Sequence, residues 1–234
     1  MLSMVIPFYN EEENIDRVVG ELVSAFETSK IDYELVLVNN GSTDSSPQLL
    51  RAWRSSREKI RVVDVGVNQG YGFGVICGLL AATGEEAGFM CGDGQVKAGD
   101  VVKVYRALEY CELAKARRVK REGGFWRAFL SLGYNRIFRA MFKIDSMDID
   151  ATPKIFRRAW LETFHLSSRD FFLDAELMLK AKYLNLRVVE LPVSPLRREG
   201  GKSKVKITAI WEFAKNMLKY KFGTVMRDWE CGRF

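Results

Sequence analysis

The sequence predicts an α/β fold, a single doubly wound and mostly parallel sheet flanked by helices, with an amphipathic helix at the C-terminal end. Strand-like and helix-like stretches alternate through the first half of the chain. The strand-like stretches are near-continuous apolar runs, as parallel strands covered on both faces require. Glycines and polar residues follow the end of each of these strands, where open α/β sheets bind ligands. These observations indicate parallel βαβ units with a ligand at the carboxyl edge of the sheet.

The first half contains the regular part of this pattern. The helix after the first strand shows the clearest period, because Ile15, Val18 and Leu22 recur three or four residues apart. The second strand, "YELVLVNN", is apolar at nearly every position, so we expect it to be buried on both faces. The expected strands are residues 2–8, 33–40, 60–66 and 86–94, and the expected helices, with their preceding turns, are residues 11–26, 41–56 and 74–84.

The second half has bulkier amphipathic stretches and more basic residues. Residues 125–142 are expected to form a helix that carries Arg127, Arg136 and Arg139 among aromatic side chains. A second helix, a returning strand and a basic loop with glycines are expected in turn, followed by a last amphipathic helix with Trp211 and Met217 on its apolar stripe. These four segments are residues 172–185, 186–194, 195–206 and 207–222, and the stripe is Ile207, Ile210, Trp211, Ala214, Met217 and Leu218.

The bulk composition narrows the classes of function. The 234 residues carry a net charge of +6, which fits a nucleic acid, an anionic membrane surface or a phosphorylated substrate as the partner. No run of about 18 apolar residues is present, so we expect no membrane-spanning helix, and the N-terminus lacks a signal-peptide pattern. The four cysteines show neither metal-ligand nor disulfide spacing, which indicates a reducing cytoplasm. The one histidine, His165, has no serine or cysteine pattern around it, which argues against histidine-based acid–base chemistry.

The glycine-rich turn after the third strand raises the alternative of a nicotinamide enzyme. Such enzymes carry G-x-G-x-x-G between a strand and a helix. A frame that starts at Gly70 reaches Val75 at its last position, and a frame that starts at Gly72 reaches Cys77. The first turn, where this motif usually lies, contains no glycine. The spacing therefore excludes a dinucleotide-binding motif at this turn.

The turns taken together resemble a different family, the family 2 glycosyltransferases, and within it the branch of dolichyl-phosphate mannose synthase-like enzymes. The resemblance covers almost the whole chain in the same order. It implies a GT-A-like fold with a Rossmann-like nucleotide-binding half. The motifs that carry it are "VIPFYNEEENI" at 5–15, "NNGSTD" at 39–44, "NQGYGFGVICGLLAATG" at 68–84, "CGDGQ" at 91–95, Arg127 with Ser131 and Asn135, and Glu190, Pro192, Val193, Arg198, Gly201, Ser203 and Lys204 near the end.

The resemblance implies a metal-dependent inverting transfer of a sugar from a nucleotide-sugar donor. It places Mg²⁺ or Mn²⁺ on Asp93 and Gln95, where the cation would stabilise the departing diphosphate. The expected domains are a catalytic domain at 1–204, with nucleotide-sugar-binding half 1–100 and acceptor-binding half 101–204, and the tail helix at 205–234. The residues that it implies for the nucleotide sugar are Pro7, Tyr9, Glu11, Asn39, Asn40, Gly41, Gly70, Gly92, Asp93 and Lys204, with Lys202 beside Lys204 over the pyrophosphate.

Two departures from the family pattern affect this half. Cys91 replaces the first acid of the D-x-D-x-Q element, and a thiol offers Mg²⁺ no hard oxygen. Asn39 and Asn40 replace two aspartates. Since an amide both donates and accepts hydrogen bonds while a carboxylate only accepts, the base edge that is read can differ from that of the family. The sequence therefore leaves the base open.

The acceptor side is expected to hold a phosphate. The resemblance implies that Arg118, Arg121, Arg127 and Ser131 bind it, and Arg127 also counts among the expected catalytic residues, with Asp93, Asp148 and Glu176. A polyprenyl phosphate, dolichyl or undecaprenyl, is already anionic and needs no general base. A sugar hydroxyl as the acceptor would need one, and the candidates are then Asp148, Asp174 and Glu176.

The leading hypothesis is a transferase that acts on a polyprenyl phosphate and lies in the cytoplasm, at the inner face of a membrane. In this hypothesis the tail helix, with Trp211, Phe213, Met217, Tyr220 and nearby lysines, lies at an anionic headgroup layer. A core-packing or homodimer-forming helix is the alternative. The other functions that remain open are a glycosyltransferase that acts on a sugar hydroxyl in envelope polysaccharide or glycan assembly, and a nucleotide-sugar-binding protein without catalysis. Nucleic acid is not expected as a partner, because the basic residues lie beside glycine loops and acids.

Overall fold

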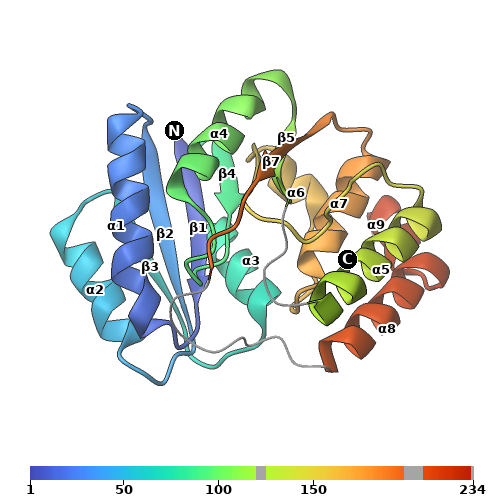
Figure 1. The fold of residues 1–234 in the computed structure, drawn as a ribbon, viewed down its shortest axis with the longest axis horizontal. Coiled ribbons are helices and arrows are strands. Elements are labelled where there is room, and N and C mark those ends of the chain that lie inside the picture. The colour runs from blue at the N-terminus through green and yellow to red at the C-terminus, as the bar shows by residue number, and fades with distance from the viewer. Residues whose placement is uncertain (120–124, 198–207, 233–234) are drawn as a thin grey trace.

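The computed structural model describes residues 1–119, 125–197 and 208–232, with the backbone alone for residues 125–132 and 208–210. Its centre is a seven-stranded sheet in the order β3-β2-β1-β4-β6-β5-β7. The four strands of the first half are β1 (Leu2–Phe8), β2 (Tyr33–Asn40), β3 (Ile60–Val65) and β4 (Glu86–Phe89), and those of the second half are β5 (Leu113–Arg118), β6 (Lys154–Arg157) and β7 (Val188–Val193). The predicted α/β architecture is confirmed (Figure 1).

The first four strands form the parallel half of the sheet. β1 pairs with β2 and β4, and β2 pairs with β3, all in parallel. Every residue of β1 and β2 is buried, as apolar strands between two helical layers should be. Because the strands run in one direction, their carboxyl ends meet at one edge, and the register aligns Phe8 with Asn39 and Asn39 with Asp64.

The second half of the sheet is mixed. β6 runs antiparallel to both β4 and β5, while β5 and β7 are parallel. The sequence predicted β7 but neither β5 nor β6. Because only β6 is antiparallel to its neighbours, the sheet is mostly parallel, as expected. The antiparallel strand β6 lies between β4 and β5 and so joins the two halves of the sheet.

Helices cover both faces of the sheet (Figure 1). One face packs against the apolar cluster of α1, α2 and α4, and the other against the cluster that includes α3 and the C-terminal helices. On the first face lie α1 (Glu12–Thr28), α2 (Ser46–Ser56) and α4 (Ala98–Ala107), which a short 3₁₀ turn (Leu108–Tyr110) follows. On the second lie α3 (Tyr71–Ala81), α5 (Phe125–Phe142), α6 (Trp160–Phe164), α7 (Leu173–Tyr183), α8 (Thr208–Phe222) and α9 (Val225–Glu230).

The C-terminal helix α8 packs on the body of the molecule through a different stripe from the one predicted. The ring of Phe213 lies 4.9 Å from that of Tyr134, and the ring of Tyr220 lies 4.8 Å from that of Phe172, both measured between centroids of tilted rings. Met217 is buried between them, as predicted, whereas Trp211 is 77% exposed. The predicted stripe was wrong at Trp211, Ala214 and Leu218, which are exposed. The inward face is instead set by aromatic side chains on α5 and at the start of α7. The predicted division of the chain at residue 204 lies outside the described residues and stays a prediction.

Within the described ranges, no helix combines the length and the apolar character that crossing a membrane requires.

Candidate active site

The turns after β1 and β2 are locked together at the carboxyl edge of the sheet. Asn10 adopts a left-handed backbone, with φ of 51°, a conformation that asparagine tolerates better than most residues. Its N–H donates to Ser42 Oγ at 3.1 Å, and the Thr43 N–H donates to Asn10 Oδ1 at 2.8 Å. The two turns therefore form one surface, on which Pro7 is the last-but-one residue of β1 and Tyr9 follows the strand, partly exposed.

Glu11 lies at the N-cap position of α1 and is 7% exposed. Its Oε2 accepts from Asn14 Nδ2 at 2.6 Å, and its backbone N–H donates to Ser46 Oγ at 3.1 Å. The carboxylate is thus oriented by the first turn of its own helix. A carboxylate here also interacts favourably with the partial positive charge of the helix N-terminus.

The two asparagines at the end of β2 point to opposite faces of the sheet and have different partners. Asn39 donates from Nδ2 to Asp64 Oδ1 at 2.8 Å and accepts at Oδ1 from the Ser42 N–H at 3.1 Å. Asn40 donates from Nδ2 to the Gly70 carbonyl at 3.0 Å. Asn40 Oδ1 is buried and has no hydrogen-bond partner within the part of the chain that the structure describes.

The predicted glycines allow close backbone approach at this edge. Gly41 has φ of 73° and Gly70 has φ of 108°, both in the region that disfavours a side chain. A Cβ on Gly70 would also collide with the Arg169 carbonyl. A Cβ on Gly92 would come within 2.6 Å of the Phe8 ring. These glycines therefore bring the turns after β2, β3 and β4 close to β1 and to the loop before α7.

Asp93 and Gln95 lie in the turn after β4, which is tied down from both sides. The Gln95 N–H donates to Asp93 Oδ1 at 3.2 Å, and Arg17 of α1 donates to the Gly94 carbonyl at 3.3 Å. Gln95 also exchanges two bonds with the segment after β7, since the Leu196 N–H donates to its carbonyl at 2.8 Å and its Nε2 donates to the Leu196 carbonyl at 3.4 Å. The bond from Nε2 orients the Gln95 side chain, so that its Oε1 is the atom that could accept from, or bind to, another group.

The donor set of this turn suits Mg²⁺ or Mn²⁺ held with few protein ligands. One carboxylate and one amide oxygen are hard ligands, and such cations take the remainder of their shell from water and substrate phosphates. A cluster of three or more His, Cys, Asp or Glu side chains that could hold a metal is absent among the described residues. The pair Asp93 and Gln95 therefore fits a cation that the diphosphate itself helps to hold.

Cys91 does not take over the role of the missing acid. Its Sγ lies 3.9 Å from the Tyr71 hydroxyl, and Tyr71 stacks on Phe171 with ring centroids 5.2 Å apart. Burial raises the pKa of the Cys91 thiol to about 12, and the nearby Asp93 adds to the effect. The side chain is therefore a neutral thiol near Asp93.

Arg118 and Asp148, which were expected on the acceptor side, form a bidentate ion pair. Arg118 donates from Nε to Oδ2 at 2.8 Å and from Nη2 to Oδ1 at 2.7 Å, and its backbone N–H adds a third bond to Oδ2 at 3.1 Å. Asp148 is 1% exposed. The Arg118 side chain is thereby held at the end of β5, and Asp148 is engaged as its orienting partner. Asn135 of α5 supports the same loop, because its Oδ1 accepts from the Ile149 N–H at 2.8 Å.

Lys115 is a buried cation beside this pair. It donates to Glu190 Oε1 at 3.1 Å, and Glu190 also accepts from Ser146 Oγ. Burial, and next to it the charge of the neighbouring Lys154, lower the pKa of Lys115 to about 8. Glu190, which the sequence singled out as a motif residue, is therefore the counterion of a buried lysine.

Glu176 lies at the start of α7, fully buried. Its carboxylate accepts from the Ser167 and Ser168 N–H groups, at 3.1 and 2.8 Å, and from Lys180 Nζ at 2.6 Å. The loop that it holds rests on the start of α3, where the Phe73 N–H donates to the Arg169 carbonyl at 3.1 Å. In this arrangement Glu176 orients the loop that packs against the glycine-rich turn.

Asp150 is a candidate that the sequence reasoning missed. Lys154 forms a buried ion pair with Asp174, which leaves Asp150 next to this pair. Burial, and next to it the charge of the neighbouring Asp174, raise the pKa of Asp150 to about 7. Its Oδ1 is buried with no hydrogen-bond partner among the residues described. The segment "DIDATP" drew attention to Asp148, and nothing in its letters distinguishes a paired aspartate from an unpaired one.

Several predicted residues lie outside the description. Arg121, Lys202 and Lys204, and also Arg198, lie in the undescribed stretches, and nothing is described of the side chains of Arg127 and Ser131, although both lie on α5. Their predicted roles at the pyrophosphate and the acceptor phosphate stay predictions.

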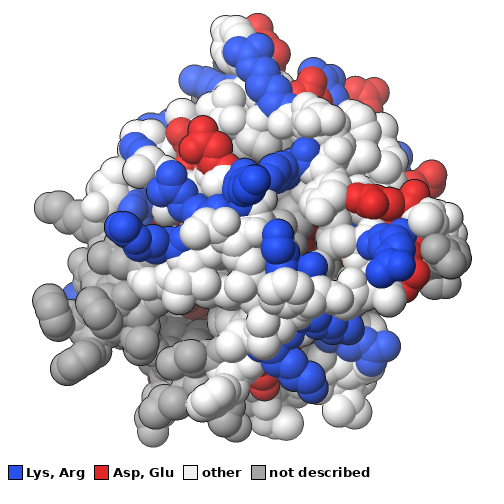
Figure 2. All heavy atoms as spheres, turned by 90° about the vertical axis from the view of Figure 1, so that its right-hand side faces the viewer, with Lys and Arg blue, Asp and Glu red and all other residues white. Residues whose placement is uncertain are grey.

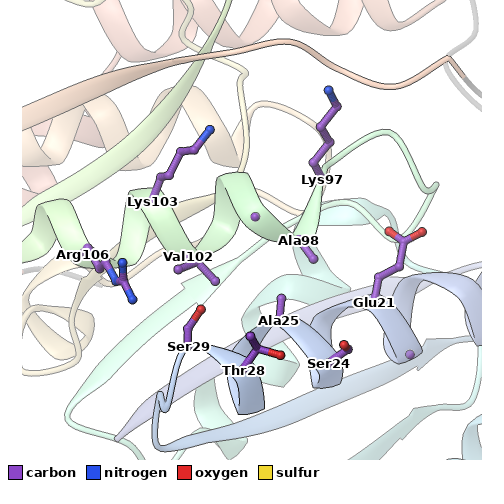
Figure 3. Close-up of a pocket in the computed structure, with 12 residues that line it drawn as sticks. Glu21, Ser24, Ala25, Thr28, Ser29, Lys97, Ala98, Val102, Lys103 and Arg106 are labelled. Carbon is purple, nitrogen blue, oxygen red and sulfur yellow. The ribbon is translucent and has the colours of Figure 1, made fainter.

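A groove with a volume of about 760 Å³ runs between α1 and α4, away from the strand ends (Figure 3). Ser24 and Thr28 come from α1, while Lys103 and Arg106 come from α4. Lys103 is already paired with Asp100 at 3.1 Å. The groove is open to solvent, and it shares no side chain with the turns described above.

The fold and these turns agree with the comparisons. The sequence profile of "Glycosyl transferase family 2" matches residues 3–164. The chain belongs to glycosyl transferase family 2. A dolichyl-phosphate beta-glucosyltransferase of Trichomonas vaginalis is 24% identical over 93% of this chain and 72% of its own length. An uncharacterized glycosyltransferase of Mycobacterium tuberculosis is 31% identical over 92% of this chain and 96% of its own. The first of these two relatives has the name of a polyprenyl-phosphate glycosyltransferase, the branch that the motifs resemble.

Solved structures of glycosyltransferases share the fold of this family 2 enzyme. Glucosyl-3-phosphoglycerate synthase from Mycobacterium tuberculosis, in complex with Mn²⁺, uridine diphosphate and glucosyl-3-phosphoglycerate, superposes with a TM-score of 0.71 at 19% identity, over 95% of this chain and 80% of that one. The same enzyme has been crystallised with Mg²⁺ and uridine diphosphate, with a TM-score of 0.73. S. aureus TarS in complex with UDP-GlcNAc superposes with a TM-score of 0.62 at 19% identity, over 92% of this chain and 65% of that one. The GT-A-like fold is thereby confirmed.

Proposed function

We propose that this family 2 glycosyltransferase moves a sugar from a uridine diphosphate sugar to a polyprenyl phosphate, with inversion at the anomeric carbon. The observation that carries the proposal is the turn of Asp93 and Gln95, which places one carboxylate and one side-chain amide at the carboxyl edge of the sheet. The dolichyl-phosphate beta-glucosyltransferase supports a lipid phosphate as acceptor. The uridine diphosphate in the related crystal structures supports the donor.

The donor half would bind the nucleotide sugar across the four strand ends. Asp93 and Gln95 would hold Mg²⁺ or Mn²⁺, which as a Lewis acid stabilises the negative charge of the departing diphosphate. The rigid turns after β1 and β2 would orient the nucleoside. Arg17 fixes the Gly94 carbonyl, so the backbone of the cation turn is set before the substrate arrives.

The acceptor half offers a positioned cation. Arg118 uses Nε and Nη2 for Asp148, and its Nη1 makes no hydrogen bond within the described part of the chain. An arginine held in this way can bind a phosphate oxygen without losing much conformational entropy. Because a phosphate acceptor is already anionic, the chemistry needs no residue to remove a proton. The burial of Asp148 and Glu176 within protein contacts is consistent with such an acceptor.

The face formed by α5, α7, α8 and α9 suits the surface of an anionic membrane. Lys and Arg side chains spread across this side of the molecule (Figure 2). On α8, Trp211 and Phe222 are 77% and 74% exposed, with Lys215, Lys219 and Lys221 also exposed. Exposed aromatic groups among lysines favour an anionic headgroup layer. We therefore propose peripheral attachment to the cytoplasmic face of a membrane.

The proposal is tested by incubating the protein with UDP-glucose, a polyprenyl phosphate and Mn²⁺, and measuring labelled lipid. The Asp93→Asn variant should lose at least about a hundredfold in rate, since a ligand of the cation is removed. The matched control is Glu109→Gln, an exposed acid on the 3₁₀ turn, which should leave the rate unchanged. Binding of uridine diphosphate without transfer to any acceptor would instead support the non-catalytic alternative.

Transfer to a sugar hydroxyl is the second candidate, and Asp150 is the observation that favours it. A carboxyl with a pKa raised to about 7 and an unpartnered buried oxygen is suited to accept a proton near neutral pH. With a phosphate acceptor, Asp150→Asn should leave the chemical step within about threefold of the wild type. A loss of a hundredfold or more, accompanied by a change in the pH–rate profile, would favour the hydroxyl acceptor.

A further inference from the structure

The end of β2 departs from the family pattern at Asn39, and its neighbour on β3 is an aspartate. The parallel register places Asn39 beside Asp64, so both side chains leave the sheet on the same face. Asn39 Nδ2 donates to Asp64 Oδ1 at 2.8 Å. Asn39 is 7% exposed, whereas Asp64 is exposed. A buried amide therefore anchors an accessible carboxylate at the rim of the sheet.

The orientation of the Asn39 amide is fixed by its other contact. The Ser42 backbone N–H can only donate, and it donates to Asn39 Oδ1 at 3.1 Å. Nδ2 must therefore face Asp64, and one of its two hydrogens is used there. An aspartate at position 39 would place a second carboxylate within hydrogen-bond distance of Asp64, where like charges repel. Asn39 and Asp64 are thus a matched pair that keeps one negative charge at this edge.

The pair lies on the donor side of the site. The turn after β2 touches the turn after β3, because a Cβ on Gly41 would come within 2.8 Å of the Val67 backbone. The same turn after β2 is bonded to the turn after β1 through Asn10 and Ser42. Because β3 is the outermost strand of this half of the sheet, Asp64 stands at the outer end of the row of the first three strand ends.

We propose that Asp64, oriented by Asn39, reads the base of the donor nucleotide. This inference rests on the proposed function and names the residue pair that selects the donor. The ring N–H of uracil donates to the second oxygen of Asp64, and the carbonyl next to it accepts the remaining Nδ2 hydrogen of Asn39. The acid of this pair thus stands on β3, directly beside the position on β2 where the family pattern has an aspartate.

The test is a set of dissociation constants for UDP, GDP, CDP and ADP in the presence of Mn²⁺. Asp64→Asn should weaken UDP by about ten- to a hundredfold, the value of one hydrogen bond to a charged group. Asn39→Asp should also weaken UDP, because it opposes two carboxylates. The double variant Asn39→Asp with Asp64→Asn restores one acid and one amide, and its UDP affinity should return to within about threefold of the wild type.

The matched control is Asp32→Asn, an exposed acid just before β2 at the opposite edge of the sheet, which should change no affinity. UDP binding that is unchanged in Asp64→Asn, or a double variant no better than Asn39→Asp, would overturn this inference and leave the proposed function standing. A wild type that prefers GDP, CDP or ADP would overturn the assignment to uracil. A wild type that binds none of the four would overturn both proposals. Thermal melting of each variant separates lost binding from lost folding.

Discussion

The two halves of the sheet differ in where they place their polar groups. In the parallel half, β1 and β2 bury apolar side chains on both faces, and the polar residues gather at the strand ends. In the mixed half, ion pairs lie inside the fold, with Lys115 on Glu190, Lys154 on Asp174 and Arg118 on Asp148. The parallel half thus presents its polar groups at the strand ends, whereas the mixed half holds charged side chains inside its core. The stability of the second half should therefore depend far more on pairing and on pH.

The largest effect is expected from Lys154→Met in the mixed half. The Lys154 side chain is 0% exposed and that of Asp174 is 5% exposed, so the change leaves a buried carboxylate without its partner. We expect the free energy of unfolding to fall by about 3–5 kcal/mol. Chemical denaturation measures the loss.

Two further variants control for this result. Lys59→Met breaks an exposed pair with Asp32 and should cost less than about 1 kcal/mol. The double variant Lys154→Met with Asp174→Leu removes both charges and should recover most of the loss. Equal losses in the buried and exposed pairs would show that the two halves do not differ.

The next largest effect is the pH dependence of Asp150→Asn. Burial raises the pKa of Asp150 to about 7, so between about pH 4 and 7 the native state holds a proton that the unfolded state has lost. The free energy of unfolding contributed by this group therefore falls as the pH rises through that window and is constant above it. Relative to the wild type, the variant should gain up to about 4 kcal/mol between pH 4 and pH 8. Parallel stability curves for both proteins would contradict the raised pKa.

The parallel half should instead respond to volume. A Cβ on Gly78 of α3 would come within 2.8 Å of the Val38 side chain, so Gly78→Ala should cost about 1–3 kcal/mol. Gly99→Ala on α4 meets nothing within 4 Å and should be neutral or stabilising by up to about 1 kcal/mol, because alanine favours the helix. Denaturation of the two variants side by side measures the difference. An equal loss of stability at both positions would contradict the argument from volume, because only Gly78 is close to other side chains.

The smallest effect on stability is expected from Trp211→Ser on the outer face of α8. The side chain is 77% exposed, so the free energy of unfolding should change by less than about 0.5 kcal/mol. Binding to vesicles that contain anionic lipid should nevertheless weaken, while Phe213→Ser, which breaks contacts with Tyr134, should instead lower stability. Unchanged vesicle binding by Trp211→Ser would remove this residue from the membrane contact.

The sequence predicted structure well where the local backbone restricts which residue types can occupy a position. The apolar runs of β1 and β2 and the glycines at 41 and 70 predicted their elements, because burial and positive φ restrict the residue types allowed. β5 was missed because "LAKARR" looks charged. Its Lys115 and Arg118 find counterions 75 and 30 residues away, which no local pattern shows.

The same distance in the chain hid part of the candidate site. Asn39 and Asp64 are 25 residues apart, and only the strand register brings them together. Asp148 and Asp150 lie in the same short segment. Only the folded structure shows that Asp148 pairs with Arg118, whereas Asp150 lies near Asp174. The helix α8 was predicted, but its inward face depended on rings from Tyr134 and Phe172, so the stripe could not be read from its own residues.

The reciprocal bonds between Gln95 and Leu196 join strand ends that lie about a hundred positions apart along the chain. These bonds link the loop after β4 to the loop after β7. An insertion between β7 and Leu196 would therefore displace Gln95, and with it the neighbouring Asp93. Natural variation in this enzyme should therefore add residues elsewhere on the rim and keep this spacing constant.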